Sequence, residues 1–327
     1  MNRRMLMTAA GAALLGLPGG AVRAEPSVTL NLSHQMAPDH TLNLVAQRFA
    51  ELVQKKTAGA VTVKVFPSGA LGAEKDNAAG LKTGMLDMGI IAVEQFPSFL
   101  PESAVLVLPY FYKDYGHVQR VLESDVAKEL QATMAEKTGI RILSFLPMPF
   151  RQMFTVDKEI HTPADLKGLK MRVPESPLYV AAFRQFGAAP TPLAWGEVYA
   201  ALQTGVAKGV ENTPEAVLSA SLQEVTKYMN MSNHLQGPST ISMSDETFRK
   251  LSPAVQKALL EAAAEAAAYD LELMVARDKE ARDKLAGKLT VVQPDVAAFK
   301  AAINYDQIQL VNSDRARALI SRLRAIQ

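Results

Sequence analysis

The chain has 327 residues, of which 35 are Lys or Arg, 33 are Asp or Glu, five are His and none is Cys. Because cysteine is absent, disulfides and thiolate metal sites are excluded. The charges nearly balance and form no basic runs, which argues against nucleic acid or an anionic membrane as a partner.

Residues 1–24 have the pattern of an export signal. Arg3 and Arg4 precede an apolar run over 5–17, and small residues lead to the expected cleavage site at Ala24. This run is shorter than the about 20 residues that cross a bilayer. The twin-arginine route and the general secretory route both fit the pattern. Removal takes three positive charges from a net charge of +2 and leaves −1. We therefore expect a protein of about 300 residues outside the cytoplasm, long enough for two domains.

Strands and helices alternate through the first half of the remaining chain. Apolar runs and period-two alternation predict strands at 30–32, 61–65, 88–93 and 140–146, and helical periodicity predicts helices at 42–52, 74–82 and 116–137. A further apolar segment covers 105–108. This order is the one expected of an α/β sheet.

The second half repeats the same alternation. Strands are predicted at 169–173, near 209–210, at 228–232 and at 240–243, and helices at 177–186 and 195–204, after a helical turn at Thr162-Pro163. The strands at 228–232 and 240–243 are expected to return the chain between lobes, which implies a hinge of more than one strand.

A long helix is predicted near the C-terminus. Ser252 is a good N-cap with Pro253 in the first turn, and the helical pattern continues to 284 or 285 before Gly287. About 33 residues at 1.5 Å each give a rod of roughly 50 Å, which is longer than one lobe needs. We expect this helix to brace both lobes.

Two similar segments support a two-lobed α/β fold. Leu-Lys-Thr-Gly at 81–84 and Leu-Gln-Thr-Gly at 202–205 each read as a helix end capped by glycine, followed by a tight turn and a strand. The predicted first lobe covers 25–149 with about 237–277. The predicted second lobe covers 150–236 with about 278–327.

Polar residues at predicted strand ends are the first candidates for a site, because open α/β sheets usually bind ligands there. Arg172 ends one strand and carries a planar fork that matches a carboxylate; its alternative is a surface ion pair. Arg151 is a weaker second candidate. Asn212 either orients a ligand or caps the helix after it. Trp195, the only tryptophan, is either an apolar cleft wall or core.

Motifs of catalysis and metal binding are absent. No two histidines stand three or four residues apart, so no zinc site is expected. The chain also lacks a Gly-x-Ser-x-Gly elbow, a Walker loop and a Gly-x-Gly-x-x-Gly turn. These absences favour binding over catalysis.

Several segments together resemble the DctP-type solute receptors of TRAP transporters. The segments are Leu166–Pro174 (LKGLKMRVP), Gly187–Leu193 (GAAPTPL) and 195–212, with FPSGALG at 66–72, LPY at 108–110 and VTKY at 225–228. The resemblance covers nearly all of the chain beyond the export signal. It implies a periplasmic-binding-protein-like fold with hinge strands and a long C-terminal bracing helix.

The resemblance also implies a function and its partners. Such a receptor is not an enzyme, carries no cofactor, captures a small organic acid between its lobes, and delivers it to a sodium-driven permease with a small DctQ-type and a large DctM-type subunit. We expect a monomer. The alternatives are a receptor for an ATP-driven importer and, less favoured, an enzyme on a two-lobed scaffold. The sequence does not identify the acid.

Site residues follow from the same resemblance. Arg172 would pair with the ligand carboxylate, Asn212 would support that group, Arg151 would contribute, and Trp195 would line the pocket. Gln35 and Glu74 would approach the far end of the ligand from the first lobe. Ala92 stands where sialic-acid-binding members carry a glutamate, which argues against sialic acid, and nearby Glu94 has no assigned role.

Overall fold

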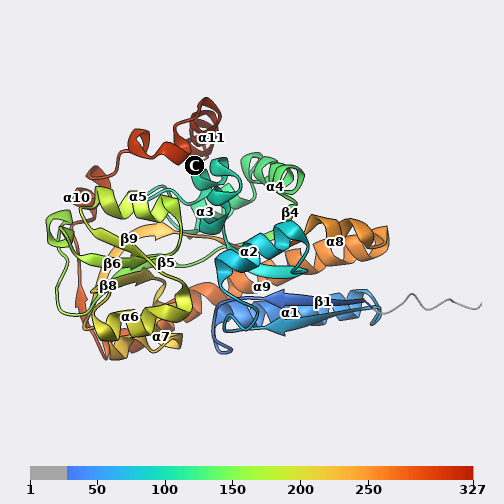
Figure 1. Ribbon diagram of the computed structural model, residues 1–327, viewed down its shortest axis with the longest axis horizontal. Coiled ribbons are helices and arrows are strands. Elements are labelled where there is room, and N and C mark those ends of the chain that lie inside the picture. The colour runs from blue at the N-terminus through green and yellow to red at the C-terminus, as the bar shows by residue number, and fades with distance from the viewer. Residues whose placement is uncertain (1–27, 327) are drawn as a thin grey trace, which may run out of the picture.

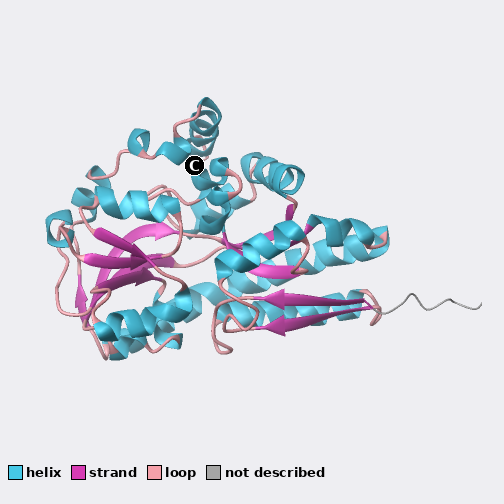
Figure 2. Ribbon diagram, in the orientation of Figure 1, coloured by secondary structure: helices cyan, strands magenta, loops and turns pink. Residues whose placement is uncertain are grey.

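The computed structural model describes residues 28–326, so the predicted export signal lies outside the described residues. Figure 1 shows two α/β lobes side by side along the long axis of the molecule. Each lobe contains one sheet with helices packed on it (Figure 2). Within residues 28–326, no helix is both long enough and apolar enough to cross a bilayer.

The first lobe is built on a five-stranded sheet in the order β2-β1-β3-β10-β4. Its strands are β1 (Val28–Ser33), β2 (Val61–Phe66), β3 (Met88–Ala92), β4 (Ile140–Leu146) and β10 (Ser239–Ser244). The first three are parallel, whereas β10 runs antiparallel to both β3 and β4. Helices α1 (Thr41–Lys56) and α2 (Glu74–Thr83) join the parallel strands. The carboxyl ends of β1 and β3 therefore point the same way, toward the second lobe.

The second lobe is built on a six-stranded sheet in the order β11-β9-β5-β8-β6-β7. Its strands are β5 (Phe150–Thr155), β6 (Lys170–Val173), β7 (Ala189–Pro192), β8 (Gly209–Asn212), β9 (Tyr228–Gln236) and β11 (Thr290–Val292). Strands β6, β7 and β8 are parallel, and β5 runs antiparallel to β8 and β9. The carboxyl ends of β6 and β8 lie at the edge that faces the first lobe (Figure 1).

Two strand connections cross between the lobes. One joins β4 to β5 and the other joins β9 to β10, with only two residues, Gly237 and Pro238, between the latter pair. The predicted strands at 228–232 and 240–243 are thus confirmed, and they lie in different sheets. Short extended crossings restrict the relative motion of the lobes mainly to rotation about the hinge.

The long helix α9 (Pro253–Ala286) has 34 residues and contacts α1 of the first lobe and α7 (Pro214–Ser219) of the second. Ser252 caps it as predicted, with its hydroxyl accepting from the Val255 amide at 3.4 Å. Its buried positions include alanines 258, 262, 263 and 266, which allow a close approach to α1. The prediction of a helix that braces both lobes is confirmed.

One predicted helix is wrong. The segment 116–137 forms two helices, α3 (Tyr115–Leu122) and α4 (Asp125–Thr138). Ser124 separates them, because its extended backbone ends α3 and its hydroxyl caps α4 by accepting from the Ala127 amide. The apolar segment at 105–108 lies at the end of a buried 3₁₀ turn, η2 (Pro101–Leu106).

The other helices complete the two lobes. They are α5 (Pro177–Gln185), α6 (Val198–Thr204), α8 (Asp245–Lys250), α10 (Val296–Ala301) and α11 (Asp314–Arg324). Although α11 belongs to the stretch that the sequence assigns to the second lobe, it packs against α4 and η2 of the first, with Arg322 pairing with Glu129 at 2.6 Å. The C-terminal segment thus contacts both lobes, and the exact division of the chain stays a prediction.

Candidate functional site

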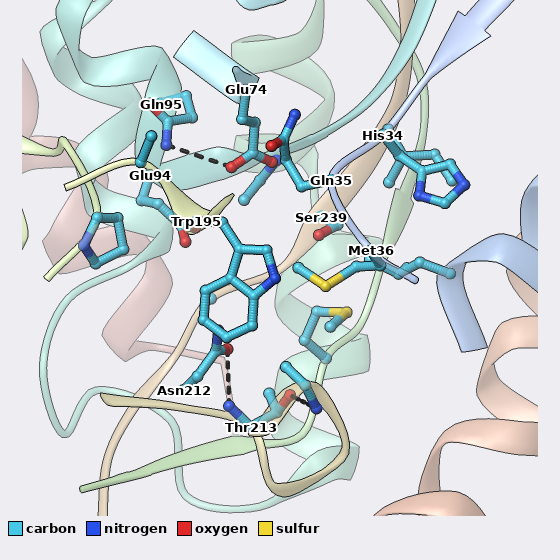
Figure 3. A pocket seen from close by; sticks show the side chains of 18 of the residues that line it. His34, Gln35, Met36, Glu74, Glu94, Gln95, Trp195, Asn212, Thr213 and Ser239 are labelled. Atoms are coloured by element: carbon cyan, nitrogen blue, oxygen red, sulfur yellow. Dashed lines mark hydrogen bonds between the residues drawn. The ribbon is translucent and has the colours of Figure 1, made fainter. Parts of the chain in front are cut away.

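The two lobes and the hinge enclose a cavity of about 50 Å³. All six residues singled out from the sequence line it: Gln35 and Glu74 from the first lobe, Arg172, Trp195 and Asn212 from the second, and Arg151 from β5 at the hinge. Figure 3 shows Gln35 and Glu74 on one side of the cavity and Trp195 and Asn212 on the other. The structure therefore brings the six residues together, while their roles remain predictions.

Arg172 is buried in the cavity wall without a carboxylate partner. Its side chain is 3% exposed, and its Nε and Nη2 both donate to the Leu193 carbonyl, at 3.0 and 2.6 Å. Among the described residues, no Asp or Glu oxygen lies within ion-pair distance of this guanidinium. Burial lowers the pKa of Arg172 to about 10, partly offset by the charge of Glu211. It is therefore still charged at neutral pH.

Arg151 has the opposite environment, because its charge is already neutralised. Its Nε and Nη2 donate to the two carboxylate oxygens of Glu211, at 2.5 and 2.7 Å, and Glu211 is fully buried. His234 Nε2 lies 3.3 Å from the same carboxylate. Burial alone would lower the pKa of Arg151, but the charge of Glu211 reverses this and raises it. Such a pair holds the cavity floor together and leaves Arg172 as the uncompensated cation.

Trp195 and Asn212 follow the ends of the parallel strands of the second lobe. Trp195 begins a short 3₁₀ turn, and its ring lies against Arg172, with 5.4 Å between the guanidinium carbon and the ring centroid. The Asn212 side-chain oxygen accepts from the Thr213 amide at 2.8 Å, which leaves its NH₂ group available to a ligand. The alternative role of Asn212 as a helix cap belongs instead to Thr213, whose hydroxyl accepts from the Ala216 amide.

Gln35 and Glu74 hold the side of the cavity that the first lobe contributes. The Gln35 amide donates to the Gly72 carbonyl at 2.9 Å and lies against Gly69, where a Cβ would come within 3.1 Å of the Gln35 oxygen. Glu74 accepts from the Ala92 amide at 2.9 Å and from Gln95 at 3.4 Å. Burial raises the pKa of Glu74 despite these two hydrogen bonds. Both side chains thus face the cavity from fixed positions.

Glu94 is a cavity residue to which the sequence assigned no role. It stands two residues after the end of β3 and is 3% exposed, and its carboxylate oxygen Oε2 has no hydrogen-bond partner within residues 28–326. Its other oxygen lies 3.7 Å from Arg151 Nη1. The strand-end rule that pointed to Asn212 also applies to Glu94, because both residues stand at the carboxyl end of a parallel strand.

No group of three His, Asp or Glu side chains within residues 28–326 is arranged to hold a metal ion. The site instead consists of one unpaired guanidinium, an aromatic wall, an amide and several carboxyl groups. This composition, enclosed between two hinged lobes, defines a receptor for a small anion that also carries polar groups.

Comparisons with known proteins agree with this class. The family model described as bacterial extracellular solute-binding protein, family 7, matches residues 32–311. A solute-binding protein of Roseobacter denitrificans is 35% identical over 297 residues, 90% of each chain. A crystal structure of a TRAP periplasmic solute-binding protein from Roseobacter denitrificans with bound L-galactonate has a TM-score of 0.86 and 33% identity, covering 91% of this chain and 99% of that one.

Two further relatives are named for other ligands. The 2,3-diketo-L-gulonate-binding periplasmic protein of Escherichia coli is 30% identical over 292 residues, 89% of each chain. The C4-dicarboxylate-binding periplasmic protein of Rhodobacter capsulatus is 34% identical over 235 residues, 72% of this chain and 70% of that one.

The chain belongs to family 7 of the bacterial extracellular solute-binding proteins and is a TRAP periplasmic solute-binding receptor. The resemblance found in the sequence motifs is therefore confirmed. Proteins of this family are receptors and not enzymes.

Proposed function

We propose that this receptor captures its acid through a salt bridge between the ligand carboxylate and Arg172, closes its lobes around it, and delivers it to a sodium-driven membrane permease. The observation that carries the proposal is the buried guanidinium of Arg172, which faces the cavity without a counterion. An uncompensated buried charge costs roughly 3–5 kcal/mol in proteins where a pair has been broken. A ligand carboxylate removes this cost, so anion binding and lobe closure favour each other.

The neighbours of Arg172 support a carboxylate rather than another anion. Because its Nε and Nη2 are held by the Leu193 carbonyl, the guanidinium has a fixed plane and presents its remaining N–H groups toward the cavity. The free NH₂ group of Asn212 lines the same cavity. A planar fork with an adjacent amide matches the two oxygens of a carboxylate.

The ligand class supported best is a hydroxylated organic acid. The first lobe contributes Gln35, Glu74 and Glu94 to the cavity lining, and these side chains suit hydroxyl or carbonyl oxygens. Two of the relatives bind or are named for acids of this kind, L-galactonate and 2,3-diketo-L-gulonate.

Binding measurements on Arg172 variants test the anchor. A thermal-shift screen of small organic acids first identifies ligands, since a ligand that binds only the folded state raises the melting temperature. Arg172→Lys keeps the charge but loses the planar fork. We expect it to weaken binding of the best acid by about 100-fold or more, as for other buried charged hydrogen bonds. The matched control is Arg48→Lys on the exposed face of α1. Near-normal affinity in Arg172→Lys would refute the anchor.

Transport measurements test the proposed partner. Vesicles that contain the small and large permease subunits should take up the acid when the receptor is present and an inward sodium gradient is imposed. Uptake that needs ATP and ignores sodium would instead support the ATP-driven importer considered from the sequence.

A further inference from the structure

Glu94 is a buried acidic residue with one carboxylate oxygen that has no hydrogen-bond partner among the described residues. It lies in the first turn of η1 (Val93–Ser98), directly after β3, and lines the cavity. Its Oε2 makes no hydrogen bond among the described residues, although the side chain is almost wholly buried. The nearest cation, Arg151, is 3.7 Å from Oε1 and is already bound to Glu211. Because buried polar atoms are normally hydrogen-bonded, we expect a ligand or a water molecule to supply the missing partner of this oxygen.

A second unpartnered oxygen lies beside Glu94. The Tyr179 hydroxyl, from α5 of the second lobe, is fully buried and also makes no hydrogen bond. Both oxygens lie close to the hinge residue Gly237. A Cβ added at this glycine would lie 2.8 Å from the Tyr179 hydroxyl and 3.2 Å from Glu94 Oε2. Glycine is therefore required there, and its missing side chain keeps the space around the two oxygens open. Gly237 lines the cavity as well.

No cation of the described cavity wall is available to pair with a second ligand carboxylate. Arg172 is the unpaired cation, Arg151 is neutralised by Glu211, and Lys75 is an exposed residue at the rim that lies 3.5 Å from Glu175. A second ligand carboxylate that reached the part of the cavity lined by the first lobe would meet Glu74 and Glu94 instead. Unpaired charges of like sign are a common means of rejecting a wrong ligand.

We propose that Glu94 is a specificity-determining residue that meets the ligand as an uncharged carboxylic acid, hydrogen-bonds a hydroxyl or carbonyl oxygen, and selects acids with one carboxylate over dicarboxylates. This inference rests on the proposed capture of a carboxylate by Arg172. A protonated Glu94 both donates and accepts, so it can satisfy a ligand oxygen and its own Oε2 together. A second carboxylate would have to be buried beside two acidic side chains without a cation.

The charges around Glu94 agree with a neutral carboxyl group. Burial raises the pKa of Glu94 to about 8; Arg151 opposes the rise, while Glu74 and Glu211 add to it. Tyr179 and Arg172 are the other ionisable groups nearby. In an open cleft we expect a pKa close to the ordinary value of about 4.3. At a pH between these two pKa values, closure is therefore accompanied by uptake of a proton at Glu94. Ligand affinity then falls as pH rises toward 8 and becomes constant above it.

Isothermal titration calorimetry of the full protein at pH 7 and 8 tests the inference, with L-galactonate and D-glucuronate as hydroxy acids and succinate and L-malate as dicarboxylates. Burial lowers the pKa of the cavity residue His34 to about 4 in the closed form. At pH 8 an open-form imidazole with an ordinary pKa of about 6.5 is also almost fully deprotonated, so the measurement at pH 8 separates its contribution. Buffers of different ionisation enthalpy report the protons taken up. Glu94→Gln keeps the shape and polarity of the side chain but cannot ionise. Glu74→Gln tests whether the neighbouring carboxyl group takes up the proton instead, and Glu51→Gln on the exposed face of α1 is the matched control.

We expect the wild-type protein to bind at least one of the two hydroxy acids about 100-fold more tightly than either dicarboxylate, and to take up close to one proton at pH 7. In Glu94→Gln this preference should fall at least tenfold and most of the proton uptake should vanish. Absence of hydroxy-acid binding, equal binding of dicarboxylates, or proton uptake that disappears in Glu74→Gln but not in Glu94→Gln would overturn the inference.

Arg172→Lys in the same series separates the two proposals. If it binds as tightly as the wild type, the carboxylate anchor itself is wrong. If it loses binding while Glu94→Gln keeps the wild-type preference and proton uptake, the anchor stands and only the role of Glu94 fails.

Discussion

At the scale of single residues, two arginines in one cavity have different tasks because of what lies beside them. Arg151 and Glu211 form a buried bidentate ion pair, whereas the Arg172 guanidinium donates to the Leu193 carbonyl and lies against the Trp195 ring. The first arrangement is structural, since both charges are satisfied within the protein. In the proposed function, the ligand carboxylate supplies the missing partner of the second. The difference comes from strand register, which sets Arg151 on β5 close to Glu211 on β8.

Breaking the Arg151–Glu211 pair should destabilise the fold. Glu211→Gln leaves the buried Arg151 charge uncompensated, and we expect a loss of roughly 3–5 kcal/mol in unfolding free energy, measured by urea denaturation. Burial would raise the pKa of Glu211, but Arg151 and His234 lower it overall. Its contribution to stability is therefore present above the ordinary carboxyl pKa and is lost as pH falls through the lower, folded-state value. A Glu211→Gln protein as stable as the wild type would contradict this account.

Trp195 offers a direct signal of binding, because it is the only tryptophan and lies against the proposed anchor. A carboxylate that pairs with Arg172 changes the electrostatic field at the indole ring and excludes water from it. We expect the emission of the protein to change in wavelength or intensity when a tightly binding acid is added, and to stay constant when the same acid is added to Arg172→Lys. An emission spectrum that is unaffected by saturating ligand in the wild type would show that the ring does not contact the ligand.

At the scale of elements, helix α7 connects the cavity to the first lobe. It begins two residues after Asn212, and its residue Glu215 accepts from the Thr41 amide at 3.0 Å and from the Thr41 hydroxyl at 2.8 Å. Thr41 is the first residue of α1, so a carboxylate of the second lobe sits at the positive end of a first-lobe helix. Arg277 of α9 adds a bond to Glu215 at 2.7 Å.

Removing the charge of Glu215 should weaken the closed form. Charged hydrogen bonds contribute about 1.5–3 kcal/mol, so we expect Glu215→Gln to lower ligand affinity by roughly tenfold or more, mainly through faster dissociation in stopped-flow measurements. Glu261→Gln, on the exposed side of α9, is the matched control. Unchanged dissociation in Glu215→Gln would mean that these contacts persist equally in the open form.

The long helix α9 contains an acidic residue whose burial carries a stability cost. Asp270 is 1% exposed, its Oδ2 has no hydrogen-bond partner, and burial raises its pKa well above the ordinary value. Because the folded state holds this proton more tightly than the unfolded chain, stability falls as pH rises above the ordinary carboxyl pKa. Asp270→Asn removes the ionisable group and with it this loss of stability at high pH. We expect a higher melting temperature at pH 8, by about 2–4 °C for each kcal/mol removed. An equal or lower melting temperature would show that the charge has a partner in the native state.

The elements themselves were largely predictable, and their pairings were not. Ser252-Pro253 marked the start of α9, and alternating valines marked β2, because both are local signals. Ser124, which divides α3 from α4, was missed because a helical apolar pattern continues across it. The role of Glu94 was hidden because burial and the lack of a partner depend on three chain segments that meet only in the folded molecule. The pairing of Arg151 with Glu211 likewise depends on contacts between residues 60 positions apart.

At the scale of the whole molecule, the two lobes enclose a cavity that contains the unpaired charge of Arg172. A ligand can shift an open–closed equilibrium only by the difference between its affinities for the two forms. In the proposed mechanism, the buried, unpaired Arg172 makes the closed form unfavourable when it is empty, and pairing with a ligand carboxylate reverses this. The hinge crossings and α9 connect the two lobes, and the contacts of Glu215 favour the closed form. We propose that the charge of Arg172 opposes closure until a ligand carboxylate is bound.

Replacing Arg172 by methionine should therefore separate closure from binding. Methionine fills a similar volume without charge, so the empty closed form no longer buries an uncompensated cation, and its population should rise while ligand binding is lost. Small-angle X-ray scattering measures this directly: we expect ligand-free Arg172→Met to be more compact than the ligand-free wild type and to resemble the wild type saturated with acid. Arg48→Met controls for the general effect of removing a surface arginine. If ligand-free Arg172→Met scatters like the open wild type, the buried charge does not hold the empty receptor open, and the contacts of Glu215 and the hinge strands would have to set the balance.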